Sequence, residues 1–219
     1  MKKNKWIIVF IIFLLIAIGV GIYLYHTKNN KNNDYAAEKT SSSNEINNNS
    51  DITYENTNTT PSETIKEETI SSFSTKLYSK DTSRQNNIKI TCNTLNNTIV
   101  NSGETFSFCQ TVGQATTSKG YEKADIYDRN GNKKQGLGGG NCQVSTTLYN
   151  AVLAVPGLVV TERHEHSNNV PYVKKGLDAA VAYGSYDFKF RNNLTNSVKI
   201  LASTDDNYVY ISLIELKKE

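Results

Sequence analysis

Three consecutive glycines, Gly138 to Gly140, run directly into a segment with helical periodicity, and this stretch constrains the chain most strongly. Apolar residues then recur at the spacing of one helix face, at Val144, Leu148, Ala151, Val152 and Val155. We therefore predict a glycine loop that leads into the first turn of a helix, with one face of that helix on the core. Pro156 and Gly157 are expected to end it.

Cys142 lies at this junction, where an anion is favoured. The first N–H groups of a helix lack intrahelical acceptors, and the helix dipole is positive at that end. A thiol there is expected to have a lowered pKa and a larger fraction of nucleophilic thiolate. The glycines let a substrate approach the backbone, whose N–H groups can stabilise an oxyanion. The stretch thus predicts a cysteine nucleophile.

His164 and His166 follow a predicted strand and are the candidates for a general base. In extended chain, residues two apart point the same way, so one or both could face Cys142. An imidazole can activate a thiol and protonate a leaving amine. The candidates for a carboxylate that orients the ring are Asp178, Asp187 and Glu165.

The cysteines also have plainer interpretations. Cys92 lies on the apolar face of a helix predicted over residues 84–97 and fits a small buried hydrophobe. In an exported domain, Cys92 and Cys109 could form a disulfide. A His-x-His pair with a cysteine could bind a metal, but no fourth ligand is apparent, so we expect neither a metal nor a cofactor.

Residues 7–25 form an uncharged, almost wholly apolar run that follows three lysines. As a helix this run would be about 28 Å long, which matches the thickness of a bilayer. The lysines favour a cytoplasmic stub over residues 1–6 and an exported C-terminal part. A cleaved signal peptide is the alternative, although no small-residue cleavage site follows. We expect a single-pass protein of the cell membrane with its C-terminal domain outside the cell.

Residues 26–71 are rich in Asn, Ser and Thr and predict a disordered linker. Residues 72–219 predict one α+β domain, in which two or so helices pack on a largely antiparallel sheet. Strands are expected at residues 98–100, 105–108, 124–127, 158–161, 179–183, 188–190, 198–202 and 208–213, with a type I′ turn at Asn130-Gly131. The net charge of +3, without a basic run interleaved with aromatics, argues against nucleic acid as a partner.

The predicted domain resembles the VanW-like domain of Gram-positive bacterial cell-envelope proteins. The matching segments, in the family's order, are residues 103–108, 112–113, 120–121 with Ala124, 138–150, 162–163, 166–167, 172–173, 178–179 and 187–190. Ser102, Cys109 and Lys174 depart from the residues usual in the family.

Some members of this family are L,D-transpeptidases, which form 3–3 cross-links in peptidoglycan. The resemblance implies a cysteine acyltransferase that acts on peptidoglycan stem peptides, or an L,D-carboxypeptidase where water is the acceptor. It assigns catalysis to Cys142 and His166, and less directly to His164 and Asp178. The oxyanion and substrate-binding residues that it implies are Gly139, Gly140, Asn141, Gln143, Ser145, Arg163, Ser167 and Tyr172.

Arg163 has two interpretations. Its forked donors suit a substrate carboxylate, and they equally suit a structural ion pair with Glu162 or Asp178. Two other functions stay open beside the transpeptidase. One is a non-catalytic wall-binding or resistance accessory module, and the other is a cysteine peptidase or amidase that cuts peptidoglycan.

Overall fold

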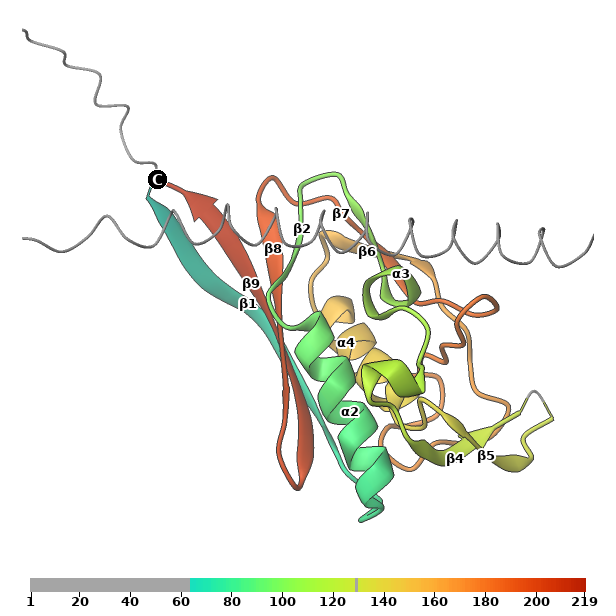
Figure 1. The fold of residues 1–219 in the computed structure, drawn as a ribbon. Coiled ribbons are helices and arrows are strands. Elements are labelled where there is room, and N and C mark those ends of the chain that lie inside the picture. The colour runs from blue at the N-terminus through green and yellow to red at the C-terminus, as the bar shows by residue number, and fades with distance from the viewer. Residues whose placement is uncertain (1–63, 129) are drawn as a thin grey trace, which may run out of the picture. The chain divides into compact units, whose positions relative to one another are not determined.

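The computed structural model describes residues 64–128 and 130–219. The expected cytoplasmic stub and membrane anchor, and the linker up to residue 63, lie outside the described residues. In the part that is described, no helix is both long and apolar enough to cross a bilayer. The described residues confirm a mixed α+β fold, in which helices pack against antiparallel sheets (Figure 1).

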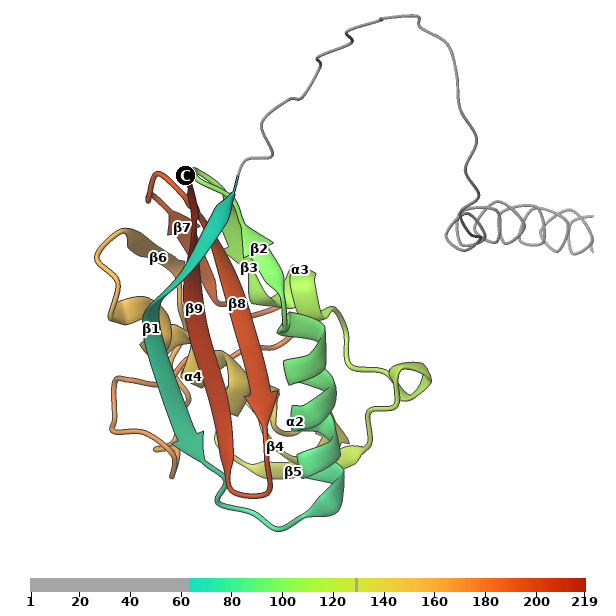
Figure 2. The same ribbon diagram turned by 90° about the vertical axis from the view of Figure 1, so that its left-hand side faces the viewer.

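A four-stranded antiparallel sheet forms one layer, in the order β1 (Ile65–Lys76), β9 (Tyr208–Lys218), β8 (Ser197–Thr204) and β2 (Thr98–Val100). Val209, Ile211 and Leu213 are buried, and Tyr208 and Tyr210 between them are exposed. This alternation gives the sheet one face toward the core and one toward solvent. Figure 2 shows the solvent face, with the helices behind it.

The edge strand β1 begins before residue 72, where the sequence analysis placed the start of the domain. It includes residues 65–71, which were assigned to the linker. This half of β1 pairs with the end of β9, from Ile65 opposite Lys218 to Thr69 opposite Ile214. Polar residues can form an edge strand because every second side chain faces solvent. The polar composition of residues 65–71 therefore predicted a linker instead of this strand.

Two helices, α2 (Thr82–Leu95) and α4 (Asn141–Leu153), cover the inner face of this sheet (Figures 1 and 2). The α2 helix begins at Asp81, whose carboxylate accepts the Arg84 N–H at 2.8 Å. Its residues Ile88, Cys92 and Leu95 are buried, which confirms the predicted helix and the buried position of Cys92. The predicted helix face of α4 is likewise buried, at Val144, Leu148, Ala151 and Val152.

The remaining elements form two smaller sheets. One has the order β3 (Thr105–Ser107), β7 (Lys189–Asn192) and β6 (Leu158–Glu162), and the other is the hairpin of β4 (Lys123–Tyr127) and β5 (Lys133–Leu137). The short helix α3 (Phe108–Val112) and a 3₁₀ turn, η1 (Thr117–Lys119), join β3 to the hairpin. In Figure 1 the hairpin lies on the opposite side of α2 and α4 from the four-stranded sheet.

In this region one predicted strand is a residue shorter than expected, and one predicted turn is not formed. The strand expected at residues 105–108 ends at Ser107, because the Ser107 hydroxyl accepts the Gln110 N–H at 3.0 Å and starts α3. The β4–β5 connection is a five-residue loop rather than a type I′ turn. Tyr127 is paired with Lys133 at the end of the hairpin, which leaves more than the two residues that a type I′ turn connects. Instead, Asp128 accepts the N–H groups of Asn130 and Asn132, both at 2.9 Å.

The strand expected at residues 179–183 is also absent, apart from a single bridge between Ala182 and Tyr186. Polar side chains of α4 take the place of a neighbouring strand. The Ser145 hydroxyl donates to the Ala179 carbonyl at 2.7 Å, and the Ala179 N–H donates to Thr146 at 3.0 Å. This segment therefore lies along the first turns of α4, beside Cys142.

Candidate active site

The glycines at the start of α4 are required by close packing. Gly140 has φ +117°, and a Cβ there would lie 2.7 Å from the Ile88 side chain on α2. A Cβ at Gly139 would lie 2.7 Å from the Asp125 carbonyl oxygen on β4. Asn87 donates to the Gly139 carbonyl at 3.1 Å and ties the loop to α2. The first turn of α4 is thus held against α2 and β4, and Cys142 with it.

Cys142 is the second residue of α4 and is partly exposed. Its sulfur lies 3.4 Å from the backbone N and 3.4 Å from the carbonyl O of Val181. The imidazole of His166 is near enough to this sulfur to lower the pKa of the thiol. The thiol therefore faces an imidazole, as the sequence analysis expected of a nucleophile.

Asp178 orients this imidazole. Its Oδ2 lies 2.6 Å from His166 Nδ1, which leaves Nε2 as the ring nitrogen for the sulfur. The Asp178 side chain is 8% exposed and that of His166 is 14% exposed. Cys142, His166 and Asp178 thus form a triad of nucleophile, base and orienting carboxylate, the arrangement found in cysteine and serine acyl-transfer sites.

The charges of Cys142, His166 and Asp178 stabilise one another. Burial raises the pKa of Cys142, but the hydrogen bond and charge of His166, the Val181 N–H and the charge of Arg84 outweigh it, and the pKa is below that of an ordinary thiol. Burial lowers the pKa of His166, but Cys142 and Asp178 outweigh it, and the pKa is raised. Both shifts favour a thiolate–imidazolium pair.

Arg163 stabilises the triad through its contacts with Asp178. Its Nη2 donates to Asp178 Oδ1 at 3.1 Å and to the Gly176 carbonyl at 3.0 Å, and its Nε donates to the Asp178 carbonyl at 2.6 Å. Nη1 bonds to Glu165 at 2.8 Å. With donors on all three nitrogens engaged by the protein, the structural ion pair with Asp178 is the interpretation that fits, and not the substrate clamp.

His164 is engaged by residues other than Cys142. Its Nε2 is 3.0 Å from Glu162 Oε1, and its ring packs against Tyr186 with centroids 4.7 Å apart. The two histidines have different carboxylate partners, Glu162 for His164 and Asp178 for His166. Ser167 follows His166 and is exposed.

Three residues of the glycine–cysteine block serve packing. Gln143 is fully buried and donates to the Lys76 carbonyl at 3.0 Å. Asn141 accepts the Thr91 hydroxyl at 2.8 Å, and Ser145 holds Ala179. In these positions the three side chains are suited to supporting the site rather than to contacting a substrate.

The first-turn N–H groups are also partly used. Asn141 donates its N–H to Gly138 O at 3.0 Å, and Gln143 donates its N–H to Gly140 O at 2.9 Å. The N–H of Cys142 has no acceptor among residues 64–128 and 130–219. Of the N–H groups at residues 141–143, this is the one that remains for an oxyanion.

The other cysteines are unpaired, so the alternative Cys92–Cys109 disulfide is not formed. Burial raises the pKa of each of these two thiols to about 12, which keeps both neutral. Asp187 bonds to Ser107 and to the Cys109 N–H, away from His166. The described part of the chain contains no group of three or more His, Cys, Asp or Glu side chains that could hold a metal.

Residues 83–214 match the family model described as VanW like protein. The chain belongs to the VanW-like family. It is 39% identical over 149 residues to an uncharacterized protein, YoaR, of Bacillus subtilis (strain 168), an alignment that covers 68% of this chain and 48% of YoaR. It is 33% identical over 129 residues to the vancomycin B-type resistance protein VanW of Enterococcus faecalis (strain ATCC 700802 / V583), covering 56% and 46%. The chain spans about half the length of these relatives. No solved structure matches it.

In this VanW-like domain, the sequence analysis missed two residues near Cys142. The Arg84 guanidinium carbon lies 4.5 Å from the centroid of the Tyr78 ring, and Tyr78 stacks on Tyr172 with centroids 5.9 Å apart. Tyr172 hydrogen-bonds to Thr146, and burial together with the charge of Cys142 raises its pKa well above the ordinary value. An arginine in the first turn of a helix opposes the dipole, and this was the signal that could have drawn attention to Arg84.

Proposed function

We propose that this VanW-like protein is an L,D-transpeptidase that acts on peptidoglycan stem peptides. The observation that carries the proposal is that Cys142, at the start of α4, has its pKa lowered by His166, whose ring Asp178 holds at 2.6 Å. A binding module would need neither an acidic thiol nor an oriented imidazole. The printed name of the Enterococcus faecalis relative, a vancomycin resistance protein, supports a role at the cell wall.

In the first step, the Cys142 thiolate attacks the carbonyl carbon of the third stem residue. The N–H of Cys142 donates to the oxyanion, and a donor from the substrate side or solvent completes its stabilisation. His166, protonated at Nε2, gives its proton to the amine of the leaving D-alanine as the peptide bond breaks. A thioester and free D-alanine result.

In the second step, an amine of another stem attacks the thioester carbonyl. His166 is now neutral at Nε2 and takes the proton from this amine, and the thiolate leaves. The product is a new amide between two stems, and the ion pair is restored. Water in place of the amine would give a shortened stem, so one site accounts for both transfer and hydrolysis.

The sequence supports a location outside the cell. We propose that residues 7–25 anchor the protein in the cell membrane, with the α+β domain on the side where stem peptides are found. This topology is tested by protease protection in intact cells, which should leave the exported domain accessible.

The activity is tested with full-length protein and purified tetrapeptide muropeptides. Mass spectrometry should detect dimers that have lost one D-alanine, and Cys142→Ala should form none. Shortened monomers without dimers would identify a hydrolase. Full activity in Cys142→Ala would overturn the covalent mechanism.

A further inference from the structure

Arg84 is a buried cation without a counter-charge. It is 6% exposed, and no carboxylate lies within ion-pair distance of its guanidinium in the described ranges 64–128 and 130–219. Its recorded partners are Gln143 Oε1, at 3.1 Å from Nη2, and the ring of Tyr78. Burying a charge without an opposite charge is costly, so such a group commonly awaits an anion.

Arg84 lies beside the nucleophile. Its hydrogen-bond partner Gln143 follows Cys142 directly, and its backbone carbonyl would be 3.2 Å from a Cβ at Gly140. The charge of Arg84 acts on Cys142, Tyr172 and Tyr78 alike. The guanidinium therefore belongs to the same site as the sulfur, on the side formed by α2.

Part of the guanidinium is available. Nε and Nη1 have no hydrogen-bond acceptor among the residues that the structure describes. Within those residues, every fully buried side-chain nitrogen or oxygen has a partner, so neither of these two nitrogens is fully buried. Two adjacent N–H groups of a guanidinium match the two oxygens of a carboxylate.

We propose that Arg84 binds the free C-terminal carboxylate of the residue that is expelled from the donor stem. This inference rests on the proposed acyl transfer and specifies its donor. The carboxylate of the fourth residue lies one residue beyond the attacked carbonyl, within about 4 Å of chain length. Arg84 thus selects stems whose C-terminal residue is the leaving residue. In a stem one residue longer, the C-terminal carboxylate lies one residue further from the attacked carbonyl and is too far from it to bind Arg84.

The first test compares two synthetic tetrapeptide stems, one a free acid and the other its C-terminal primary amide. The full-length wild-type protein should prefer the acid by about tenfold or more in kcat/KM, as expected for a charged hydrogen bond. Arg84→Gln should lose this preference mainly through a higher KM for the acid, and Arg84→Lys should keep part of it. Equal losses on both peptides would overturn the role in carboxylate binding.

The second test needs no turnover. The Cys142 sulfur displaces iodide from either iodoacetate, an anion, or iodoacetamide, a neutral reagent of similar size. Both rates depend equally on the fraction of Cys142 that is thiolate, so their ratio on one protein does not depend on that fraction. The ratio therefore measures the effect of a cation near the sulfur. Arg84→Gln should lower this ratio about tenfold, with Arg84→Lys in between.

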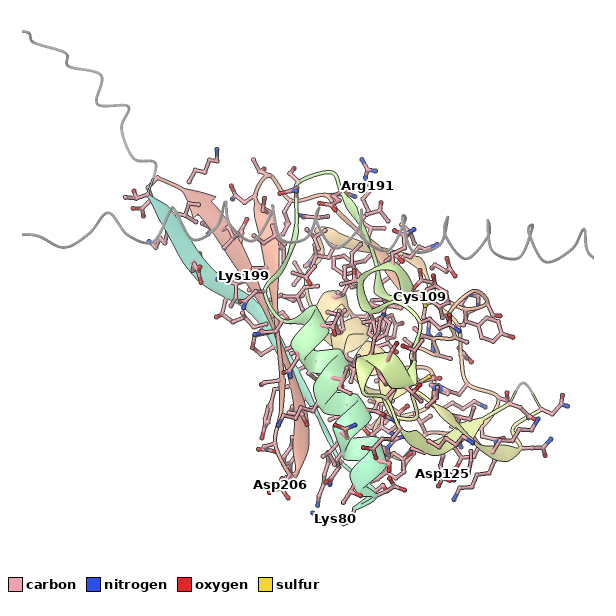
Figure 3. The ribbon with its side chains drawn as sticks, in the orientation of Figure 1. Lys80, Cys109, Asp125, Arg191, Lys199 and Asp206 are labelled. Atoms are coloured by element: carbon pink, nitrogen blue, oxygen red, sulfur yellow. The ribbon has the colours of Figure 1, made fainter. Side chains whose placement is uncertain are left out.

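Arg191→Gln is the matched control, because Arg191 is exposed on β7 and bonds to Asn193. Figure 3 shows it at the opposite end of the domain from Lys80, which precedes α2. An unchanged ratio in Arg84→Gln, with a wild-type unfolding transition in urea as proof of folding, would overturn the proposal. A lowered ratio without cross-linking by the wild type would support the anion site and refute the transpeptidase.

Discussion

One oxygen of Asp178 holds both the ring and the backbone of His166. Oδ2 lies 2.6 Å from Nδ1 of the imidazole and accepts the backbone N–H of the same histidine at 2.7 Å. The other oxygen bonds to Arg163. The direction of Nε2 toward Cys142 is therefore decided by a carboxylate that is itself braced by an arginine.

Replacing Asp178 with Asn should lower the rate of cross-linking by about 100-fold or more, because an amide can hold the wrong tautomer and does not stabilise the imidazolium. The rate should be measured on tetrapeptide donors, together with the pH profile of Cys142 alkylation. Glu165→Gln is the control, since Glu165 is an exposed partner of Arg163 and should matter little. An Asp178→Asn protein within about threefold of wild type would contradict the assignment.

Alkylation of Cys142 by iodoacetamide should persist below pH 9.0, the pKa of an ordinary thiol. Because the pKa is lowered, the thiolate is lost only when the pH falls through that lower value. His166→Gln leaves burial as the largest influence, so the thiol pKa should rise and the rate at neutral pH should fall about tenfold or more. His164→Gln should leave the profile unchanged. If both variants behaved alike, His166 would not be the partner of the sulfur.

Gly140→Ala should destabilise the domain by about 3 kcal/mol, from strain at positive φ together with overlap with Ile88. The free energy of unfolding in urea measures this. Gly184 also has a positive φ, +77°, but nothing lies within 4 Å of its Cβ, so Gly184→Ala should cost only about 1 kcal/mol. Equal losses would mean that close packing on α2 does not restrict Gly140.

Ser145→Ala should cost about 1–2 kcal/mol, since the Ala179 carbonyl would lose its buried donor. Reactivity of Cys142 should also fall, because the segment that brings the Val181 N–H to the sulfur is loosened. Thr94→Ala removes a hydroxyl that bonds only to its own helix and is the control for both readouts. If Ser145→Ala lost stability but Cys142 kept its reactivity, this segment would not contribute to the function of Cys142.

Local patterns predicted the elements well where the physics is local. The spacing of Ile88, Cys92 and Leu95 is enough to place a helix, since neighbours three or four apart share a face. The same reasoning failed at residues 179–183, whose apolar run resembles a buried strand. There Ala179 and the Val181 N–H bond to side chains of α4, a substitution that no local pattern records.

The sequence by itself determined that a cysteine follows a glycine loop at the start of an apolar helix, because a few adjacent residues carry that information. Only the tertiary structure decided which histidine and which carboxylate meet this cysteine, and that Arg163 braces Asp178 while Arg84 lies beside the sulfur. Those choices depend on the paths of loops between residues that are distant in the chain. A side chain's role depends on what folding brings within about 3 Å of it.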